Sequence, residues 1–201
     1  MIITYRDACP EDCPAIAGLD RIAAGGVLDF LYRDLVPGMS PVELAAEILS
    51  HDDESYSFRN ARVAETGGEV AGMLISYHSS HHALSDTITD YFPRDRIDHI
   101  RVLFTAKVPE SLYIDSLAVH APWRRHGIGG ELLAHAARKA RGMGLDTLSL
   151  ITFADNKIAH RLYGKYGFKL VQQLPLHPHE LIPHRGGIYV MAAPAGMKGR
   201  T

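Results

Sequence analysis

The chain has 201 residues, of which 46% are hydrophobic and 22% charged, and its formal net charge is -2. This length is enough for one sizeable hydrophobic core, so a single domain is expected. A nearly balanced charge, with a pI of about 6.6, argues against nucleic acid as a partner. No apolar run reaches the roughly 18 residues of a membrane span, and the N-terminus "MIITYRDACPEDC" lacks the pattern of a signal peptide, which predicts a cytoplasmic protein.

The N-terminal part predicts a strand, two helices and a hairpin, in that order. Residues 1–8 alternate weakly and suit an edge strand. A first helix is expected within 10–26, with Asp12 as its cap and its end at Gly25 and Gly26. Ser40 caps a second helix, and the turn "TGGE" joins two alternating runs into a hairpin.

The segment from about residue 78 to residue 110 shows no clear hydrophobic period. It is too long for an ordinary loop of a compact domain. We therefore expect an irregular or helical insertion here, either a helix-bearing lid or a mobile segment, whose role the sequence leaves open.

The second half of the chain alternates strands and helices. "SLYIDSLAVHAP" carries the strongest strand signal and ends at Pro122. Apolar residues then recur every four positions from Ile128 to Ala140, which predicts a helix that ends near Gly142 and Gly144. The remaining elements are expected at 146–153 (strand), 155–167 (helix), 168–174 (strand) and 186–193 (strand).

Three glycines lie between that strand and that helix, in "WRRHGIGGELL". Each costs about 1 kcal/mol in a helix, so they indicate another role. A strand end, a glycine turn and a helix start direct several backbone N–H groups and the positive end of the helix dipole at one volume. Some residues of such a turn adopt positive φ, and Arg124 and Arg125 add charge, so the turn predicts a diphosphate site.

Other interpretations of this turn fit less well. A Walker A loop needs G-x-x-x-x-G-K followed by Ser or Thr, and the sequence has no such string. The dinucleotide pattern G-x-G-x-x-G begins at Gly127 and Gly129 but has Leu132 in its third place. A purely structural helix start remains an alternative.

The hexapeptide "RRHGIG", Arg124 to Gly129, resembles the Q/R-x-x-G-x-G/A motif of the GCN5-related N-acetyltransferase (GNAT) family. "NKIAHRLYGKYGF" resembles the family's N-x-x-A-x-x-x-Y-x-x-x-G-F segment, and the likeness is close from about Tyr113 to Val171. The resemblance implies an α/β (α+β) fold: a single N-acetyltransferase domain over 1–201, with a mixed, mostly antiparallel sheet flanked by helices. It also implies an enzyme that moves an acetyl group from acetyl-CoA, its co-substrate, to a primary amine by direct attack in a ternary complex.

The resemblance also implies roles for individual residues. Asp115 would be the base for the amine, Tyr163 would hydrogen-bond or protonate the departing sulfur, and Asn156 would hold the pantetheine arm. For Asp115 a strand-edge carboxylate paired with an arginine stays an alternative, and for Tyr163 a half-buried core tyrosine. The rest of the implied coenzyme site is the strand backbone and the turn: Leu117, Ala118, Val119, Arg124, Arg125, His126, Gly127, Ile128, Gly129 and Gly130.

Neither the cysteines nor the histidines predict a metal site. Cys9 and Cys13 are interpreted as reduced thiols, because a zinc site needs two more close ligands. His177, His179 and His184 lie close together, but Pro183 and a spacing one residue too long exclude the HExxH helix. We expect loop histidines and no metal.

A small-molecule amine or a protein amine is the expected partner, without nucleic acid or membrane. The acceptor, the acyl chain length and the oligomeric state, including a homodimer, are left open. A second class of function is a non-catalytic acetyl-CoA or CoA-binding sensor or regulatory module, and a third is a nucleotide-binding enzyme.

Overall fold

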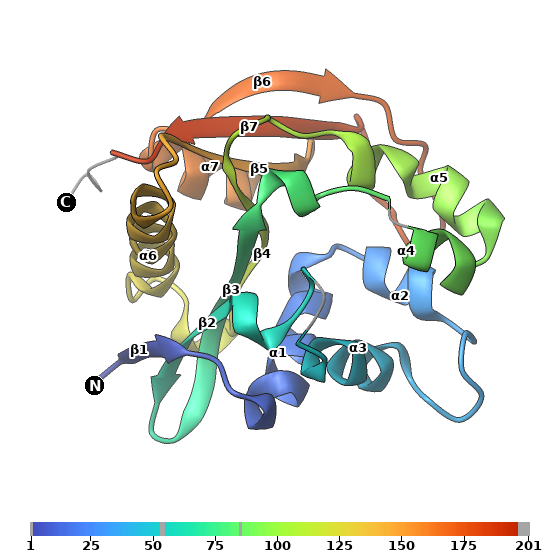
Figure 1. The fold of residues 1–201 in the computed structure, drawn as a ribbon, viewed down its shortest axis with the longest axis horizontal. Coiled ribbons are helices and arrows are strands. Elements are labelled where there is room, and N and C mark those ends of the chain that lie inside the picture. Colours follow the sequence, from blue (N-terminus) through green and yellow to red (C-terminus); the bar gives the residue numbers. More distant parts are fainter. Residues whose placement is uncertain (1, 53–54, 85, 197–201) are drawn as a thin grey trace. The chain divides into compact units, whose positions relative to one another are not determined.

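The computed structural model describes residues 2–52, 55–84 and 86–196. In this part of the chain seven strands form one open sheet in the order β1-β2-β3-β4-β5-β7-β6, and only β4 and β5 run parallel among the pairs of known register (Figure 1). The predicted fold class, a mixed and mostly antiparallel sheet with helices, is confirmed. By compactness the chain divides into a first unit, Met1–Ser76 with Asp115–Leu133, and a second unit, Tyr77–Ile114 with Ala134–Thr201.

The first unit contains the edge of the sheet and the predicted hairpin. β1 (Thr4–Asp7) pairs antiparallel with β2 (Ala61–Thr66), which pairs antiparallel with β3 (Glu69–His78). The turn between β2 and β3 is made by Gly67 and Gly68, whose φ angles are 59° and 82°. Because side chains rarely adopt such angles, glycine is required here and sets the register of the hairpin.

Three helices lie side by side in the first unit: α1 (Cys13–Ala23), α2 (Val27–Tyr32) and α3 (Pro41–Ser50) (Figure 1). Ile16, Leu19 and Leu49 are fully buried among them. Ser40 caps α3 as predicted, since its Oγ accepts the N–H of Glu43. The prediction of two helices here was incomplete, because α2 begins at once after Gly26 and is only six residues long.

Asp12 is the N-cap residue of α1, as predicted, but its side chain does not cap the helix. A 3-10 turn, η1 (Pro10–Asp12), precedes α1, and the side chain of Asp12 makes no cap bond to α1. Its carboxylate accepts the Cys9 N–H at 2.9 Å and a 2.6 Å bond from Arg6. The hydrogen bonds from Arg6 lower the pKa of Asp12 to about 2. The carboxylate of Asp12 is thus bonded to Arg6 of β1 and to the backbone of Cys9, and it makes no bond to α1.

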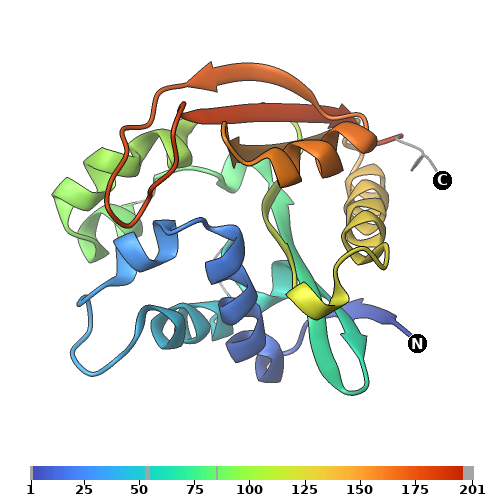
Figure 2. The ribbon, with the colours of Figure 1, turned by 180° about the vertical axis from the view of Figure 1, so that it is seen from behind.

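The second unit contains the other edge of the sheet. The first residues of β4 (Leu112–Val119) pair in parallel with β5 (Thr147–Phe153), and β7 (Ile188–Pro194) lies antiparallel between β5 and β6 (Lys169–Leu174). α7 (Lys157–Lys165) lies beside β7, as Figure 2 shows from behind, with the ring of His160 stacked on that of Tyr189. These elements match the predicted ranges within a few residues.

The segment from 78 to 110 is helical. After η3 (Ser79–His81) it forms α4 (Asp86–Tyr91) and α5 (Arg94–Thr105). Ile97 and Ile100, three residues apart, are buried on α5. An apolar stripe of so few residues, between charged neighbours, explains why the sequence shows no clear period.

Candidate active site

The predicted phosphate turn joins the end of β4 to the start of α6, and both of these ends belong to the first unit. β4 is extended beyond its last residue by a bond from the N–H of His120 to the carbonyl of Ala71, at 2.9 Å. A 3-10 turn, η4 (Ala121–Trp123), follows, and four residues separate it from α6 (Ile128–Gly142). Because the turn 124–127 lies between the end of β4, which is bonded to β3, and the start of α6, both of its ends are fixed by regular structure.

The backbone of this turn has the geometry of an anion-binding nest. Arg125 has φ of 66° and Gly127 has φ of 81°. The first backbone bond of α6 joins the N–H of Glu131 to the carbonyl of Gly127 at 3.0 Å. Within the described residues, the N–H groups from Arg125 to Gly130 therefore have no backbone acceptor. Alternating left-handed residues and free N–H groups at a helix start favour an anion.

The three glycines of the turn serve different purposes. Only Gly127 needs its conformational freedom, because Gly129 and Gly130 do not have positive φ and belong to the first turn of α6. At these two positions glycine leaves the N–H groups uncovered by a side chain, which suits close approach of a ligand to the backbone.

The side chains of the turn are exposed and basic. The Nε of Arg124 donates to the carbonyl of Val119 at 2.9 Å, so this side chain is tied to the end of β4. The bond uses Nε alone, and the Nη donors of the guanidinium are left for an anion. Arg125 and His126 are exposed as well, and the Nδ1 of His126 lies 2.9 Å from the carbonyl oxygen of Arg124.

Gly72 on β3 is a site residue that the sequence prediction missed. A Cβ at this position would lie 3.0 Å from the backbone oxygen of Ala118 and 3.1 Å from Cγ2 of Ile128. The absence of a side chain thus allows β3 to support both the end of β4 and the first residue of α6. A glycine inside an otherwise regular strand pattern signals such close approach and could have been used.

The side chains of β4 alternate in burial past the middle of the strand. Ser116 and Ala118 are buried, whereas Asp115, Leu117 and Val119 are half-buried. This pattern leaves the predicted base, Asp115, and the predicted coenzyme-contacting positions Leu117 and Val119 partly accessible, whereas the side chain of Ala118, the third such position, is buried.

The predicted residues Asn156 and Tyr163 belong to the second unit. Asn156 is the N-cap of α7, where its Oδ1 accepts the N–H of Ala159 at 3.1 Å. Tyr163 is 8% exposed, and its ring lies 5.4 Å from that of Phe168. Burial raises the pKa of Tyr163 to about 12, above the value near 10 expected for a free phenol.

The sequence predicts that Asn156 and Tyr163 share one face of α7. The face of Tyr163 is the buried one, whereas Ile158 on the neighbouring face is 71% exposed. The cap bond uses one amide oxygen of Asn156 and leaves its NH2 group as a donor.

The histidines of the connection between β6 and β7 contact different partners. His99 of α5 lies with its Nε2 3.1 Å from the carbonyl oxygen of His177, and its ring meets that of His179 edge-on at 5.6 Å. His184 instead stacks on Phe153 and binds Asp155 at 2.7 Å. Among the described residues no three His, Cys, Asp or Glu side chains gather as metal ligands.

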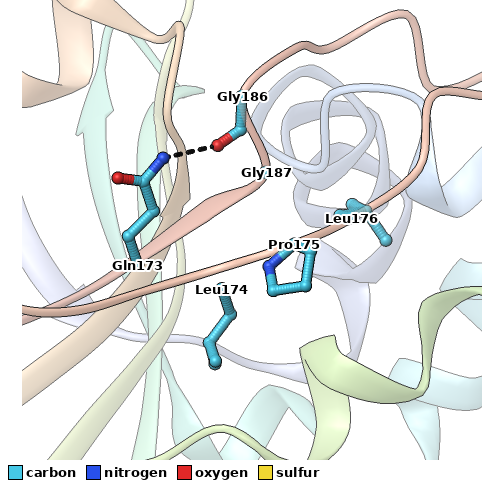
Figure 3. A pocket seen from close by; sticks show the side chains of 6 residues that line it. All are labelled: Gln173, Leu174, Pro175, Leu176, Gly186 and Gly187. Atoms are coloured by element: carbon cyan, nitrogen blue, oxygen red, sulfur yellow. Dashed lines mark hydrogen bonds between the residues drawn. The ribbon is translucent and has the colours of Figure 1, made fainter.

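A cavity of about 400 Å³ lies between the end of β6 and the start of β7 (Figure 3). Its polar side chain, Gln173, donates its Nε2 to the carbonyl of Gly186 at 2.9 Å. At Gly187 a Cβ would lie 2.1 Å from the oxygen of Leu174, so only glycine fits there. None of the predicted site residues lines this cavity, and its remaining walls are apolar side chains and glycines.

The comparisons with known proteins agree with this geometry. The family model "Acetyltransferase (GNAT) family" matches residues 28–168. A solved acetyltransferase is 25% identical, with a TM-score of 0.68 over 96% of this chain and 99% of that one. An N-acetyltransferase from Staphylococcus aureus Mu50 is 24% identical, with a TM-score of 0.67 over 94% and 100%. The ribosomal-protein-S18-alanine N-acetyltransferase from Escherichia coli is 18% identical, with a TM-score of 0.57 over 100% and 98%.

The chain belongs to the GNAT acetyltransferase family, as the motifs at Arg124–Gly129 and Asn156–Phe168 predicted. It is therefore an acetyl-CoA-dependent N-acetyltransferase. No helix in the described part of the chain is long and apolar enough to cross a membrane.

Proposed function

We propose that the protein transfers the acetyl group of acetyl-CoA to a primary amine by direct attack in a ternary complex. The observation that carries this proposal is the row of N–H groups from Arg125 to Gly130 without backbone acceptors, at the start of α6. Such a row suits the doubly charged pyrophosphate of the coenzyme. The guanidinium groups of Arg124 and Arg125 add charge-assisted hydrogen bonds.

The remaining coenzyme contacts are proposed for the backbone of β4 and for α7. The half-buried positions Leu117 and Val119, with Ala118 between them, would pair with the pantetheine arm and present an N–H to the thioester oxygen. An N–H donor aimed at this oxygen stabilises the charge that develops on it during attack. The NH2 group of Asn156 is proposed to hold the same arm.

Asp115 is proposed as the base. A primary amine with a pKa near 10.4 is protonated at neutral pH, so R–NH3+ must first give one proton to the carboxylate, directly or through water. The freed nitrogen attacks the thioester carbon, the C–S bond breaks, and the sulfur leaves with its electron pair. The second N–H proton of the former ammonium is then lost, so the products are the acetylated amine, CoA–SH and one proton.

Tyr163 is proposed to donate a hydrogen bond to the departing sulfur. Its pKa of about 12 lies far above that of an ordinary thiol, near 8.5, so complete proton transfer to the thiolate would be uphill by about 5 kcal/mol. The phenol therefore stays protonated and stabilises the thiolate by donation. The thiolate acquires its proton from solvent or from the acid formed at Asp115.

The domain organisation of the chain, its location and its oligomeric state were also predicted from the sequence. We propose that 1–201 works as a single N-acetyltransferase domain and that 78–110 is an insertion in it. A cytoplasmic location stays a prediction. A homodimer also stays a prediction; Leu170 and Val171 on the edge strand β6 are 50% and 58% exposed, which is where a second copy would find apolar surface.

The test is release of CoA–SH from acetyl-CoA across a panel of small amines and of peptides with free amino termini, with calorimetry of acetyl-CoA alongside. The proposal expects micromolar binding, turnover with at least one amine, and loss of about a hundred-fold in kcat for Asp115→Asn. Binding without turnover across the panel would support the sensor or regulatory module instead. Binding of NAD or ATP in place of acetyl-CoA would support a nucleotide enzyme.

A further inference from the structure

A histidine in the connection between β6 and β7 is held by a carboxyl group of the same unit, and neither has a role in the mechanism above. The Nδ1 of His184 lies 2.7 Å from Oδ1 of Asp155, across 29 positions of sequence. The other carboxyl oxygen of Asp155, Oδ2, accepts the N–H of Arg185 at 2.9 Å. Because both oxygens are engaged, the carboxyl group is fixed in one orientation towards the imidazole.

These bonds determine which nitrogen of His184 carries a hydrogen. Burial acts to raise the pKa of Asp155, but the bonds from Arg185 and His184 outweigh it, so this pKa lies below its ordinary value. The side chain is therefore an ionised carboxylate at neutral pH, which accepts hydrogen bonds and cannot donate them. Nδ1 is then the donor, and the neutral imidazole keeps its lone pair on Nε2.

The ring of His184 is fixed, and its Nε2 is open to solvent. The imidazole stacks on Phe153, the last residue of β5, with the ring centroids 3.8 Å apart. Among the described residues Nε2 has no hydrogen-bond partner, and the side chain is 25% exposed. The buried side-chain atoms without a partner in this part of the chain belong to Arg62, His82 and Ser116, so Nε2 is not one of them. An imidazole held in this way by a carboxylate can accept a proton and return it as an acid.

The pair lies at the start of α7, where Asn156 is proposed to hold the pantetheine arm. Asp155 precedes Asn156 in the turn from β5 to α7, and the N–H of Asn156 donates to the carbonyl of Phe153 at 3.0 Å. The imidazole of His184 thus packs on the residue that fixes the backbone of Asn156. Tyr163 lies further along the same helix, and helix side chains lean towards the N-terminus, so its side chain extends back towards this end.

The segment that follows His184 is tied to the same turn. The N–H of Ala154 donates to the carbonyl of Gly187 at 3.0 Å, and a Cβ at Gly186 would lie 3.3 Å from that of Ala154. The connection from His184 to β7 therefore packs directly on the end of β5. All of these residues belong to the second unit.

We infer that His184 carries a proton from the attacking nitrogen to the departing sulfur, and that Asp155 positions His184 for this step. The inference rests on the proposed function and names a further catalytic residue for the same reaction. After the nitrogen has attacked, the lone pair of Nε2 takes its acidic proton, and the electrons of that N–H bond stay on the nitrogen. The C–S bond then breaks, Nε2 gives the proton to the sulfur, and CoA–SH leaves while the imidazole returns to its neutral form.

This route completes the proton balance of the reaction. Nitrogen and sulfur are bonded to the same carbon when the proton moves, so one Nε2 can serve both. An imidazolium is a stronger acid than an ordinary thiol, so the transfer to sulfur is downhill, whereas transfer from Tyr163 is uphill. The proton that Asp115 takes from the ammonium is then the one released to solvent.

Asp155→Asn separates proton transfer from structural support. The N–H of Arg185 needs an acceptor, so the amide oxygen of the new side chain takes that place and its NH2 group faces Nδ1 of His184. Both hydrogen bonds are kept, but the neutral imidazole now carries its hydrogen on Nε2 and has no lone pair there. We expect kcat to fall at least about ten-fold, with the KM of acetyl-CoA within about two-fold and the unfolding temperature almost unchanged.

His184→Asn removes the atom that carries the proton. The amide NH2 of the new side chain can still donate to Asp155, but it cannot take up a proton at neutral pH. With the best amine of the panel, kcat should fall about a hundred-fold, and the KM of acetyl-CoA should stay within about two-fold. The double variant should lose little more than His184→Asn alone, since both substitutions act on one step.

Nitrogen-15 NMR of the imidazole rings tests the tautomer without any turnover. In its neutral form His184 should carry its hydrogen on Nδ1 in the unaltered protein and on Nε2 in Asp155→Asn. An Nε2–H tautomer in the unaltered protein would overturn the inference whatever the rates are.

The matched controls are His177→Asn, an exposed position of the same connection, and Asp146→Asn, an exposed position just before the start of β5. Both should keep kcat. If the unaltered protein acetylates an amine and His184→Asn or Asp155→Asn keeps its full kcat, the pair is only structural and the inference is wrong. If the unaltered protein neither binds acetyl-CoA nor acetylates any amine, it is the proposed function that fails.

Discussion

A Cβ at Gly72 on β3 would lie 3.1 Å from Cγ2 of Ile128, the first residue of α6. The same atom would lie 3.0 Å from the backbone oxygen of Ala118. The position of the helix start that carries the free N–H groups therefore depends on the missing side chain of a residue 56 positions earlier in the chain, on a strand that the sequence prediction treated as ordinary.

Gly72→Ala should weaken acetyl-CoA binding several-fold, because the strand end or the helix start must shift by a few tenths of an ångström. Crowding of a packed interior should also cost about 1–3 kcal/mol of unfolding free energy. Calorimetry and urea unfolding measure the two effects. Gly18→Ala in α1, where a Cβ meets nothing within 4 Å, is the control, and it should keep full affinity.

Gly127→Ala and Gly68→Ala form a matched pair. Their φ angles are 81° and 82°, and a Cβ would meet nothing within 4 Å at either position. Each substitution should cost about 1 kcal/mol of stability, because alanine is strained in the left-handed region. Only Gly127→Ala should raise the dissociation constant of acetyl-CoA, by about ten-fold. The backbone of this turn must relax around the new side chain, and this displaces the N–H groups of residues 125–130, whereas Gly68 lies in the hairpin turn between β2 and β3. Equal affinities of the two variants would argue against the phosphate role of the turn.

Tyr163→Phe should lower kcat about ten-fold to a hundred-fold while the KM of acetyl-CoA changes little. The ring packing on Phe168 is retained, so the unfolding temperature should hardly move. Since burial raises the pKa of Tyr163 to about 12, its ionisation should cause no loss of kcat below about pH 11. Steady-state rates between pH 6 and pH 10 test both statements, and an unchanged kcat would remove the role of this phenol.

His82 should make the second unit sensitive to acid. This side chain is 4% exposed and stacks on Tyr113 at 3.9 Å, and burial lowers its pKa to about 4. The unfolded chain, with a histidine pKa near 6.5, binds the proton first, so stability is complete above pH 6.5 and is lost as the pH falls towards 4. The loss should reach about 3 kcal/mol.

Urea unfolding of the unaltered protein and of His82→Phe, between pH 4 and pH 7, measures this dependence. The phenylalanine keeps a ring against Tyr113 but cannot bind a proton, so its stability should depend less on pH. Parallel curves for the two proteins would assign the acid sensitivity to other groups.

The parts of the fold that the sequence predicted are those with local signals. The hairpin glycines, the Ser40 cap and the four-residue period of α6 each act over a few positions, and each lies where it was expected. The turn from Arg124 to Gly130 is of the same kind, since a strand end, glycines and a helix start are adjacent in sequence.

The features that the sequence did not predict depend on contacts between distant segments. The carboxylate of Asp12 accepts hydrogen bonds from Arg6 and Cys9, so it does not bond to the helix that it was expected to cap. The hydrogen bond between Tyr56 and Asp20 joins two segments that are 36 positions apart, and no sequence pattern indicates that they are in contact. α2 is too short to show a helical period, and burial of Tyr163, which sets its pKa, is a property of the packed unit.

A crystal structure of the protein with bound acetyl-CoA tests the central claim most directly. We expect the pyrophosphate oxygens within about 3 Å of the N–H groups between Gly127 and Gly130, with a guanidinium of Arg124 or Arg125 beside them. Coenzyme bound at another surface, with the start of α6 exposed to solvent, would contradict the account.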